Sequence, residues 1–310
     1  MWLTIAKWSF FAALIVAFGW AIRENQDSFA RIFEFGFLPF IGVLVCIFIF
    51  IFFQGLILKE SVRHFGIRLT SSEWFGLIML TFFTNYFVPF LGFGVRAAYL
   101  KRVHSLSLVN YSKTLIAILI VEWTVYAGMA LIALVILFGQ GGEFHMFLTV
   151  FMATIVIGFF VTVLFRAEWI PQFVPMSGKV KQILLDWRDY VHDGRTLSLL
   201  FLHTLFQFAG FAGAFFIVYT VLAPQTPWAA SFVAAAMTDF AFLIRIAPAA
   251  AGSLEAGVYL ASQAFGVDWG MSLVIATVIR IAIIIVFLAF GPYFFWSLVM
   301  RRGLLVNKSN

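Results

Sequence analysis

The stretch FLIRIAPAAAGSLEAG, residues 242–257, decides how this chain folds, because it places polar and turn-forming residues inside a very apolar sequence. It contains Arg245, Pro248, Gly252 and Glu255. Proline removes a backbone donor and glycine frees the backbone, so one continuous helix is not expected here. Inside a membrane, broken backbone is tolerated only where protein or a cavity surrounds it. The stretch therefore predicts a turn at membrane depth.

The composition supports a membrane setting. The chain is 63% apolar and only 11% charged, and it has 41 phenylalanines, which is far outside the range of soluble domains. Runs such as 35–58 and 112–138 are long enough to cross a bilayer as helices. We therefore expect an all-α, polytopic integral membrane protein. Residues 1–22 lack a small-residue cleavage site, so they predict a retained helix rather than a signal peptide.

Other classes of site find little support in the sequence. The single cysteine, Cys46, excludes a disulfide within the chain and disfavours a thiolate metal site. There is no phosphate-binding loop and no zinc-ligand spacing. The net charge of +6 comes mostly from loop residues and does not indicate nucleic-acid binding. We expect no metal, no cofactor and no nucleic-acid partner.

The loop charges predict the topology, since Lys and Arg mark cytoplasmic loops. Basic linkers flank segment 74–95 on both sides, so this segment should enter the membrane and return. The linkers around 228–265 have no Lys or Arg, so this segment should dip in from the opposite side. Both termini are then cytoplasmic. The basic regions are 59–73, 96–113, 166–195 and the tail; the regions without Lys or Arg are 139–143, 222–227 and 266–270.

Each predicted dip contains the residues that a re-entrant turn needs. They are Pro89, Gly92 and Gly94 in the first dip, and Pro248 and Gly252 in the second. The expected architecture is about six full spans plus two re-entrant helical hairpins. Residues 1–138 and 139–310 form two repeats of opposite orientation, an arrangement typical of transporters. Residues 177–192 in the linker predict an amphipathic helix on the cytoplasmic surface.

Charged residues lie deep in the predicted spans. Glu122 and Arg280 are each roughly 15 Å into their helices at ~1.5 Å per residue, near the bilayer centre. An unpaired charge there costs at least ~2.5–3.5 kcal/mol, so pairing or water is required. We expect Arg280 to pair with Glu255, and Arg96 with Glu122 or Glu255. The alternative is a set of buried ion pairs that only fix helix register. Asp239 and Arg245 are weaker candidates, Asn85 either caps a half-helix or binds substrate, and His203 is expected to be a packing residue.

At these residues the chain resembles the transmembrane region of the lysylphosphatidylglycerol synthetase family, over nearly its whole length. One pattern in that family carries Asn, Pro, Gly and Arg, then Glu in the next helix; a second carries Pro, Gly, Glu and Gly, then a later Arg. The second dip departs from the family, because alanines replace its usual second Pro and paired Gly, and we expect this dip to be stiffer. The matching residues are Asn85, Pro89, Gly92, Arg96 and Glu122, then Pro248, Gly252, Glu255, Gly266 and Arg280; the alanines are Ala249, Ala250 and Ala251.

The resemblance implies lipid translocation in a bacterial or archaeal cytoplasmic membrane. The family's soluble aminoacyl-transfer domain is not in this sequence, so we expect a flippase for a charged-headgroup lipid and no synthesis of lysyl lipid. The expected partner is a membrane lipid substrate; a separate lipid synthase or a second copy of the chain is an open further partner. The expected substrate-binding residues are Asn85, Arg96, Arg245 and Arg280; the expected counter-ions or proton carriers are Glu122, Asp239 and Glu255.

Two other functions stay open from the residues. An intramembrane lipid-modifying transferase would use the carboxylates as base and the arginines as a phosphate clamp. The sequence has no Asp-x-Asp motif and no basic, His-rich catalytic loop, which disfavours this hypothesis. A non-transporting partner subunit of an envelope-lipid synthase is the third hypothesis. We assign no catalytic residue.

Overall fold

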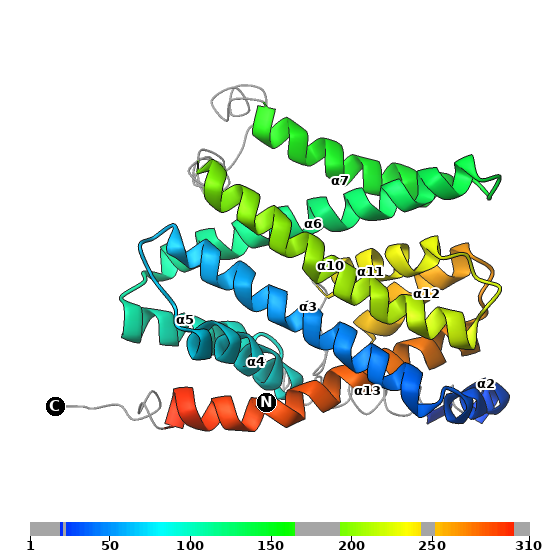
Figure 1. Ribbon diagram of the computed structural model, residues 1–310, viewed down its shortest axis with the longest axis horizontal. Coiled ribbons are helices and arrows are strands. Elements are labelled where there is room, and N and C mark those ends of the chain that lie inside the picture. Colours follow the sequence, from blue (N-terminus) through cyan, green and yellow to red (C-terminus); the bar gives the residue numbers. More distant parts are fainter. Residues whose placement is uncertain (1–18, 21–22, 165–192, 243–251, 301–310) are drawn as a thin grey trace, which may run out of the picture. The chain divides into compact units, whose positions relative to one another are not determined.

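The computed structural model describes residues 19–20, 23–164, 193–242 and 252–300, and every regular element in these ranges is a helix (Figure 1). Most of the predicted first span, the predicted amphipathic helix at 177–192, and the residues Arg245, Pro248 and Ala249–Ala251 lie outside them. The elements are α2 (Gln26–Ala30), η1 (Arg31–Glu34), α3 (Phe37–Arg63), α4 (Ser71–Phe87), α5 (Leu91–His104), α6 (Leu108–Gly139), α7 (Met146–Leu164), α10 (Gly194–Leu222), α11 (Ala229–Ala241), α12 (Ser253–Ala264), α13 (Trp269–Phe294) and the π-helix η3 (Phe295–Met300).

Within the described ranges, four helical segments are long and apolar enough to cross a membrane. They are α3, α6, α10 and the continuous segment formed by α13 and η3. They coincide with four of the six predicted spans. α7 covers the predicted span at 144–165, has 19 residues, and packs against α6 beside it (Figure 1). The chain is thus a multi-pass helical membrane protein, while the total of six spans stays a prediction.

The region of the first predicted hairpin contains two helices, α4 and α5, with a break at Val88–Phe90, while its re-entrant course stays a prediction. It is longer than the predicted 74–95, because α4 begins at Ser71 and α5 continues to His104. With 17 and 14 residues, the helices are about 25 and 21 Å long at ~1.5 Å per residue. Each is shorter than the ~30 Å hydrocarbon core, which favours a hairpin over a complete crossing. Pro89 accounts for the break, since it cannot donate within a helix.

The second predicted hairpin contains α11 and α12, which pack against each other. α11 is rich in small residues, and its five alanines from Ala229 to Ala236 are fully buried. A Cβ atom added to Gly257 in α12 would lie 2.6 Å from the Cα of Thr238 in α11. The two backbones therefore approach as closely as small residues allow, which is typical of helix packing in membranes.

The chain divides into two compact units, and each unit contains segments from both halves of the sequence. Unit 1 comprises 1–48, 81–93 and 210–290, and unit 2 comprises 49–80, 94–209 and 291–310. The unit boundaries fall inside α3, α4, α5, α10 and α13. The Glu255–Arg280 region belongs to unit 1, whereas Arg96 and Glu122 belong to unit 2. The repeat halves at 1–138 and 139–310 stay a prediction from loop charge.

Candidate functional site

In unit 1, Arg280 of α13 and Glu255 of α12 form the predicted ion pair. The Nε atom of Arg280 donates to Oε1 of Glu255 at 2.9 Å, and Nη2 donates to Oε2 at 2.8 Å. Such a two-point bond is among the stronger side-chain interactions. The two side chains remain 18% and 14% exposed, so the pair is not sealed off from its surroundings. Arg280 lies about 16 Å along α13 from Trp269, well inside the span.

The local backbone holds Glu255 in this position. Gly252 has a φ of 85° immediately before α12, a left-handed conformation that glycine adopts without strain. Its N–H donates to Oε2 of Glu255 at 2.9 Å, so the carboxylate also caps the helix to which it belongs. The negative charge is stabilised further by its place in the first turn of α12. Asp239, another predicted site residue, lies in the last turn of α11 and is half-buried.

Arg96 of α5 is buried in unit 2, with 5% of its surface exposed. Its Nε donates to the hydroxyl of Tyr111 in α6 at 2.7 Å, and its guanidinium lies 5.5 Å from the centre of the Tyr111 ring. The tyrosine therefore orients the arginine through a hydrogen bond and a cation–π contact. Sequence reasoning missed Tyr111, since its role depends on the angle at which α5 meets α6.

Glu122 of α6 is also buried, with 5% exposed, and its described partner is Gln207 of α10. The Nε2 of Gln207 donates to Oε1 of Glu122 at 3.2 Å. Tyr111 and Glu122 are separated by about 16 Å of helix at ~1.5 Å per residue. The described contacts of Arg96 and Glu122 thus lie at different levels of α6, and their predicted pairing stays a prediction.

Asn85 makes the bond expected of the first of its two predicted roles, and the second, substrate binding, stays a prediction. Its Oδ1 accepts the backbone N–H of Gly92 at 2.7 Å, across the break at Pro89. Asn85 is buried, with 7% exposed, and this bond satisfies one of the N–H groups that start α5. The side chain therefore caps the second helix of the hairpin. Gly94 is exposed, and a Cβ atom there would meet nothing within 4 Å.

A second cluster that sequence reasoning missed surrounds Glu73 at the start of α4. Its Oε2 accepts from the N–H and from the hydroxyl of Thr70, both at 3.0 Å. Its Oε1 accepts from the hydroxyl of Tyr99 at 2.7 Å and lies 3.4 Å from Nε2 of His104. The cluster joins the start of α4 to the end of α5. The Thr70-x-x-Glu73 spacing is a capping-box signal, but nothing in the sequence points to Tyr99 or His104.

Burial raises the pKa of Glu73, but the hydrogen bonds from Thr70 and Tyr99 and the nearby His104 outweigh it and lower the pKa to about 2. A carboxylate with a depressed folded-state pKa stabilises the fold above its ordinary value of 4.5. That contribution is lost as the pH falls from about 4.5 toward about 2. The base of the hairpin is therefore acid-sensitive.

Tyr99→Phe should loosen this cluster by removing the donor to Oε1 of Glu73. Hydrogen bonds to charged groups contribute roughly 1.5–3 kcal/mol, so we expect the free energy of unfolding to fall by about 2 kcal/mol. Denaturant unfolding of purified protein in detergent measures this. Tyr86→Phe, at a half-buried tyrosine in α4, is the control and should change stability by less than about 0.5 kcal/mol. Equal effects of the two changes would show that the Glu73 cluster does not stabilise the hairpin.

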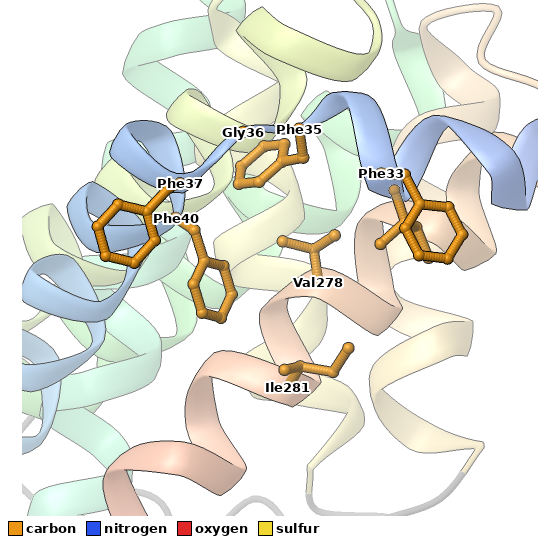
Figure 2. A pocket seen from close by; sticks show the side chains of 8 residues that line it. Phe33, Phe35, Gly36, Phe37, Phe40, Val278 and Ile281 are labelled. Carbon is orange, nitrogen blue, oxygen red and sulfur yellow. The ribbon is translucent and has the colours of Figure 1, made fainter.

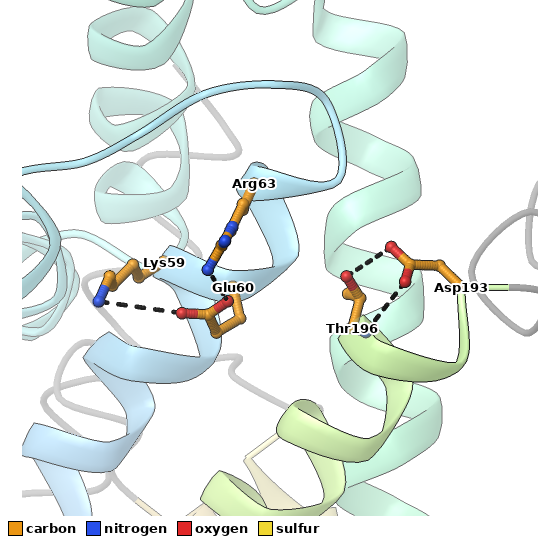
Figure 3. A network of polar contacts seen from close by, with 5 residues as sticks. All are labelled: Lys59, Glu60, Arg63, Asp193 and Thr196. Carbon is orange, nitrogen blue, oxygen red and sulfur yellow. Dashed lines mark hydrogen bonds and ion pairs between the residues drawn. The ribbon is translucent and has the colours of Figure 1, made fainter.

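A related cluster lies at the end of α3 and the start of α10, in unit 2. Asp193 accepts from the N–H of Thr196 at 3.1 Å and from its hydroxyl at 2.6 Å, which caps α10. Figure 3 shows this cap beside Glu60, which pairs with Lys59 and Arg63. The hydrogen bonds from Thr196, together with His64 at 3.3 Å, lower the pKa of Asp193 to about 2. The cap fixes where α10 begins.

Unit 1 also contains an apolar pocket of about 280 Å³ (Figure 2). Aromatic rings from 33–40 line one side, and Val278 and Ile281 of α13 line the other. Gly36, with a φ of 74°, makes the bend between η1 and α3 that opens the pocket. Its lining has no polar side chain, so the pocket is suited to a hydrocarbon group rather than to a headgroup.

Metal binding has no evident site in the part of the chain that the structure describes, where no three His, Cys, Asp or Glu side chains converge. The family model of the lysylphosphatidylglycerol synthase TM region matches residues 5–291. No curated protein and no solved structure matches the chain.

Proposed function

Because this chain belongs to the family of the lysylphosphatidylglycerol synthase TM region, we propose that it moves a lipid with a charged headgroup across the cytoplasmic membrane. The family match covers almost the whole chain, and the four long apolar helices fit a membrane role. The proposed lipids are aminoacyl phospholipids, polyprenyl phosphates or related envelope lipids. The proposal describes a flippase and assigns no enzymatic step to the chain.

The observation that carries the proposal is the Glu255–Arg280 pair. A buried charge pair adds little stability compared with apolar packing, so stability alone explains it poorly. Charged residues inside membrane spans usually belong to substrate or ion pathways. This pair is also partly exposed and stands at the start of a half-length helix. We propose that a lipid phosphate reaches the arginine from this exposed side.

The proposed mechanism is that Arg280 exchanges its carboxylate partner, Glu255, for the phosphate of the lipid. Glu255 neutralises Arg280 while the site is empty, and the lipid phosphate replaces the carboxylate when a headgroup enters. A guanidinium suits both partners, because its fork of donors matches carboxylate and phosphate oxygens alike. Arg96 and Arg245 are proposed to hold the anion along the path, with Glu122 and Asp239 as counter-ions. Rocking of two inverted repeats would alternate access to the two leaflets.

The apolar pocket supports the same proposal. Ile281 lines it and directly follows Arg280 along α13. A membrane offers hydrocarbon chains as the abundant occupant of such a pocket, and burial of each CH₂ group contributes about 0.8 kcal/mol. A lipid tail could thus remain in an apolar environment on the same helix that offers its headgroup a charge.

The test is reconstituted flipping. Purified protein is placed in vesicles whose lipids include a trace of fluorescent headgroup-labelled phospholipid, and a membrane-impermeant quencher reports how fast label reaches the outer leaflet. Separate arms use an anionic, an aminoacyl and a polyprenyl-phosphate lipid. We expect faster transfer for at least one arm than in protein-free vesicles. Rates equal to the protein-free rate in all three arms would refute the flippase. A new lipid product formed from a labelled donor would point instead to a transferase.

The predicted topology gives a second, independent expectation. Cysteines placed at exposed positions, Arg68→Cys and Lys101→Cys, should both be labelled only from the cytoplasmic side, and Gln225→Cys only from the outside. The reason is that basic linkers at both ends of the first hairpin mark one side of the membrane. Labelling with a membrane-impermeant maleimide in intact cells and in inverted vesicles measures this.

The labelling uses a Cys46→Ala background, because the native thiol is only half-buried. Labelling of positions 68 and 101 from opposite sides would mean that the α4–α5 hairpin crosses the membrane. The inverted-repeat topology would then be wrong, while the family and the helical fold would be unaffected.

A further inference from the structure

One side of the apolar pocket in unit 1 is formed by a short segment that other contacts hold in place. The segment is α2 with η1, and the bend at Gly36 joins it to α3. Gly270, at the start of α13, lets the segment approach closely, since a Cβ atom there would lie 2.5 Å from Oδ1 of Asn25. Nη1 of Arg31 donates to the carbonyl of Leu222 at the end of α10, at 3.4 Å. The pocket wall is thus fixed by two separate contacts.

The pocket reaches a surface that faces lipid. Figure 2 shows Val278 and Ile281 of α13 between the ring of Phe40 and the ring of Phe33. Val278 is 2% exposed, whereas Ile281 is 39% exposed. Ile281 lies about 18 Å along α13 from Trp269 at ~1.5 Å per residue, inside a span. An exposed apolar side chain at that depth faces the hydrocarbon of the bilayer.

The lining indicates what kind of group fills the pocket. Among the described residues around it, none has a polar side chain. A buried water molecule needs about two to four polar partners, so water is a poor occupant. An empty apolar space of about 280 Å³ leaves its lining without contact partners, which destabilises the fold. A hydrocarbon group provides these contacts, and the bilayer beside Ile281 supplies such groups.

The size of the pocket limits how much of a lipid it can hold. Pockets that enclose a drug-sized ligand have roughly 300–1,000 Å³, and this pocket has about 280 Å³. A membrane lipid is larger than such a ligand, so only part of one tail fits. Arg280 directly precedes Ile281 on α13 and bonds to Glu255. A tail in the pocket would therefore lie within one helical turn of the charge pair.

We propose that this pocket binds one hydrocarbon tail of a membrane lipid and selects the lipid by that tail. Ile281 and Phe33 border the lipid-facing side, and Val278 contacts the inserted part of the tail. A role in choosing the transported lipid rests on the proposed function, whereas binding of the tail does not. Straight acyl tails and branched isoprenoid tails share this chemistry, and the test separates them.

Photo-crosslinking locates the tail. Purified protein is placed in vesicles that contain a trace of phospholipid with a photoreactive diazirine in one acyl tail, and mass spectrometry identifies the crosslinked peptides. We expect crosslinks to concentrate at 32–40 and 278–281, above the yield at Phe147, an exposed residue of α7 that reports general contact with lipid. Unlabelled phospholipid and unlabelled polyprenyl phosphate compete in separate arms, and the stronger competitor identifies the preferred tail.

Val278→Phe is the diagnostic variant, because a larger side chain at this buried position fills space that the tail would occupy. Each displaced CH₂ group weakens binding about fourfold, so displacing two should lower crosslinking at 32–40 by roughly tenfold. Val135→Phe is the matched control, since it makes the same change at a valine of α6 that is 58% exposed and lies outside the pocket. We expect this control to crosslink like the wild type.

Several results would overturn the site. Wild-type crosslinks at 32–40 and 278–281 that are no stronger than those at Phe147 would show only general contact with lipid. Crosslinks that neither competitor reduces would show the same. Unchanged crosslinking in Val278→Phe would place the tail elsewhere, and should this variant not fold, the wild-type map still decides the matter. Crosslinking in the pocket together with absent lipid flipping would refute the flippase and leave the tail site standing.

Discussion

Glu255→Gln is expected to abolish lipid transfer and to reduce the amount of folded protein. The substitution removes the negative charge and leaves Arg280 without it, at about mid-depth in α13. Breaking a buried ion pair on one side costs about 3–5 kcal/mol. Glutamine keeps an oxygen that can still accept from the N–H of Gly252, so the helix cap survives. The loss therefore reports on charge. Reconstituted flipping and detergent-solubilised yield measure the two effects.

A double variant separates the effect of the pair on folding from its effect on lipid transfer. Glu255→Gln combined with Arg280→Gln leaves no lone charge, so the amount of folded protein should recover. Lipid transfer should not recover, because the proposed anion ligand is gone. Glu143→Gln, at an exposed glutamate between α6 and α7, is the control and should leave both measurements unchanged. Normal folding and transfer by the single Glu255→Gln variant would show that Glu255 is neither counter-ion nor proton carrier.

The sequence predicts the features of this protein that depend on local chemistry. Hydrophobic runs of membrane length appear as α3, α6, α10 and α13. Pro89 coincides with a break between two helices, and Gly252 directly precedes α12 with a positive φ. The Glu255–Arg280 pair also follows from sequence, because two opposite charges at similar depth in an apolar medium have few other partners.

The features that sequence reasoning missed depend on how helices meet. Tyr111 bonds to Arg96, and Tyr99 bonds to Glu73, each across a helix pair whose crossing is set by packing. Tyrosine near a segment end is ordinarily an interface anchor, so its type alone does not reveal a buried bond. The bond of Gln207 to Glu122 likewise cannot be read from the sequence, because it depends on how α10 packs against α6.

The two predicted carboxylates have different environments, and this difference could not be read from the sequence. Glu255 bonds to a guanidinium and to a backbone N–H, so its charge is matched locally. Glu122 accepts from the side-chain amide of Gln207 in α10. The same residue type at similar depth thus bonds to an arginine in unit 1 and to a glutamine in unit 2.

Gly92→Ala should prevent the first hairpin from closing, and Gly94→Ala should not. A Cβ atom at Gly92 would overlap the backbone carbonyl of Thr81 in α4, and backbone cannot rotate away as a flexible side chain can. Overpacking typically costs about 1–3 kcal/mol, and more where the neighbour is rigid. At Gly94 the same change meets nothing within 4 Å. There, alanine should stabilise the helix by up to about 1 kcal/mol, because it is the better helix former.

The same substitution at two positions only two residues apart on α5 should thus change the free energy of unfolding in opposite directions. Unfolding of the purified variants in detergent gives the free energies, and flipping rates show whether a closed hairpin is needed for transfer. We expect Gly92→Ala to lower both and Gly94→Ala to leave transfer intact. Equal stability of the two variants would mean that α4 and α5 are not in backbone contact at Thr81. The bond from the N–H of Gly92 to Asn85 would then not be the cap that starts α5, and headgroup binding would be the remaining predicted role of Asn85.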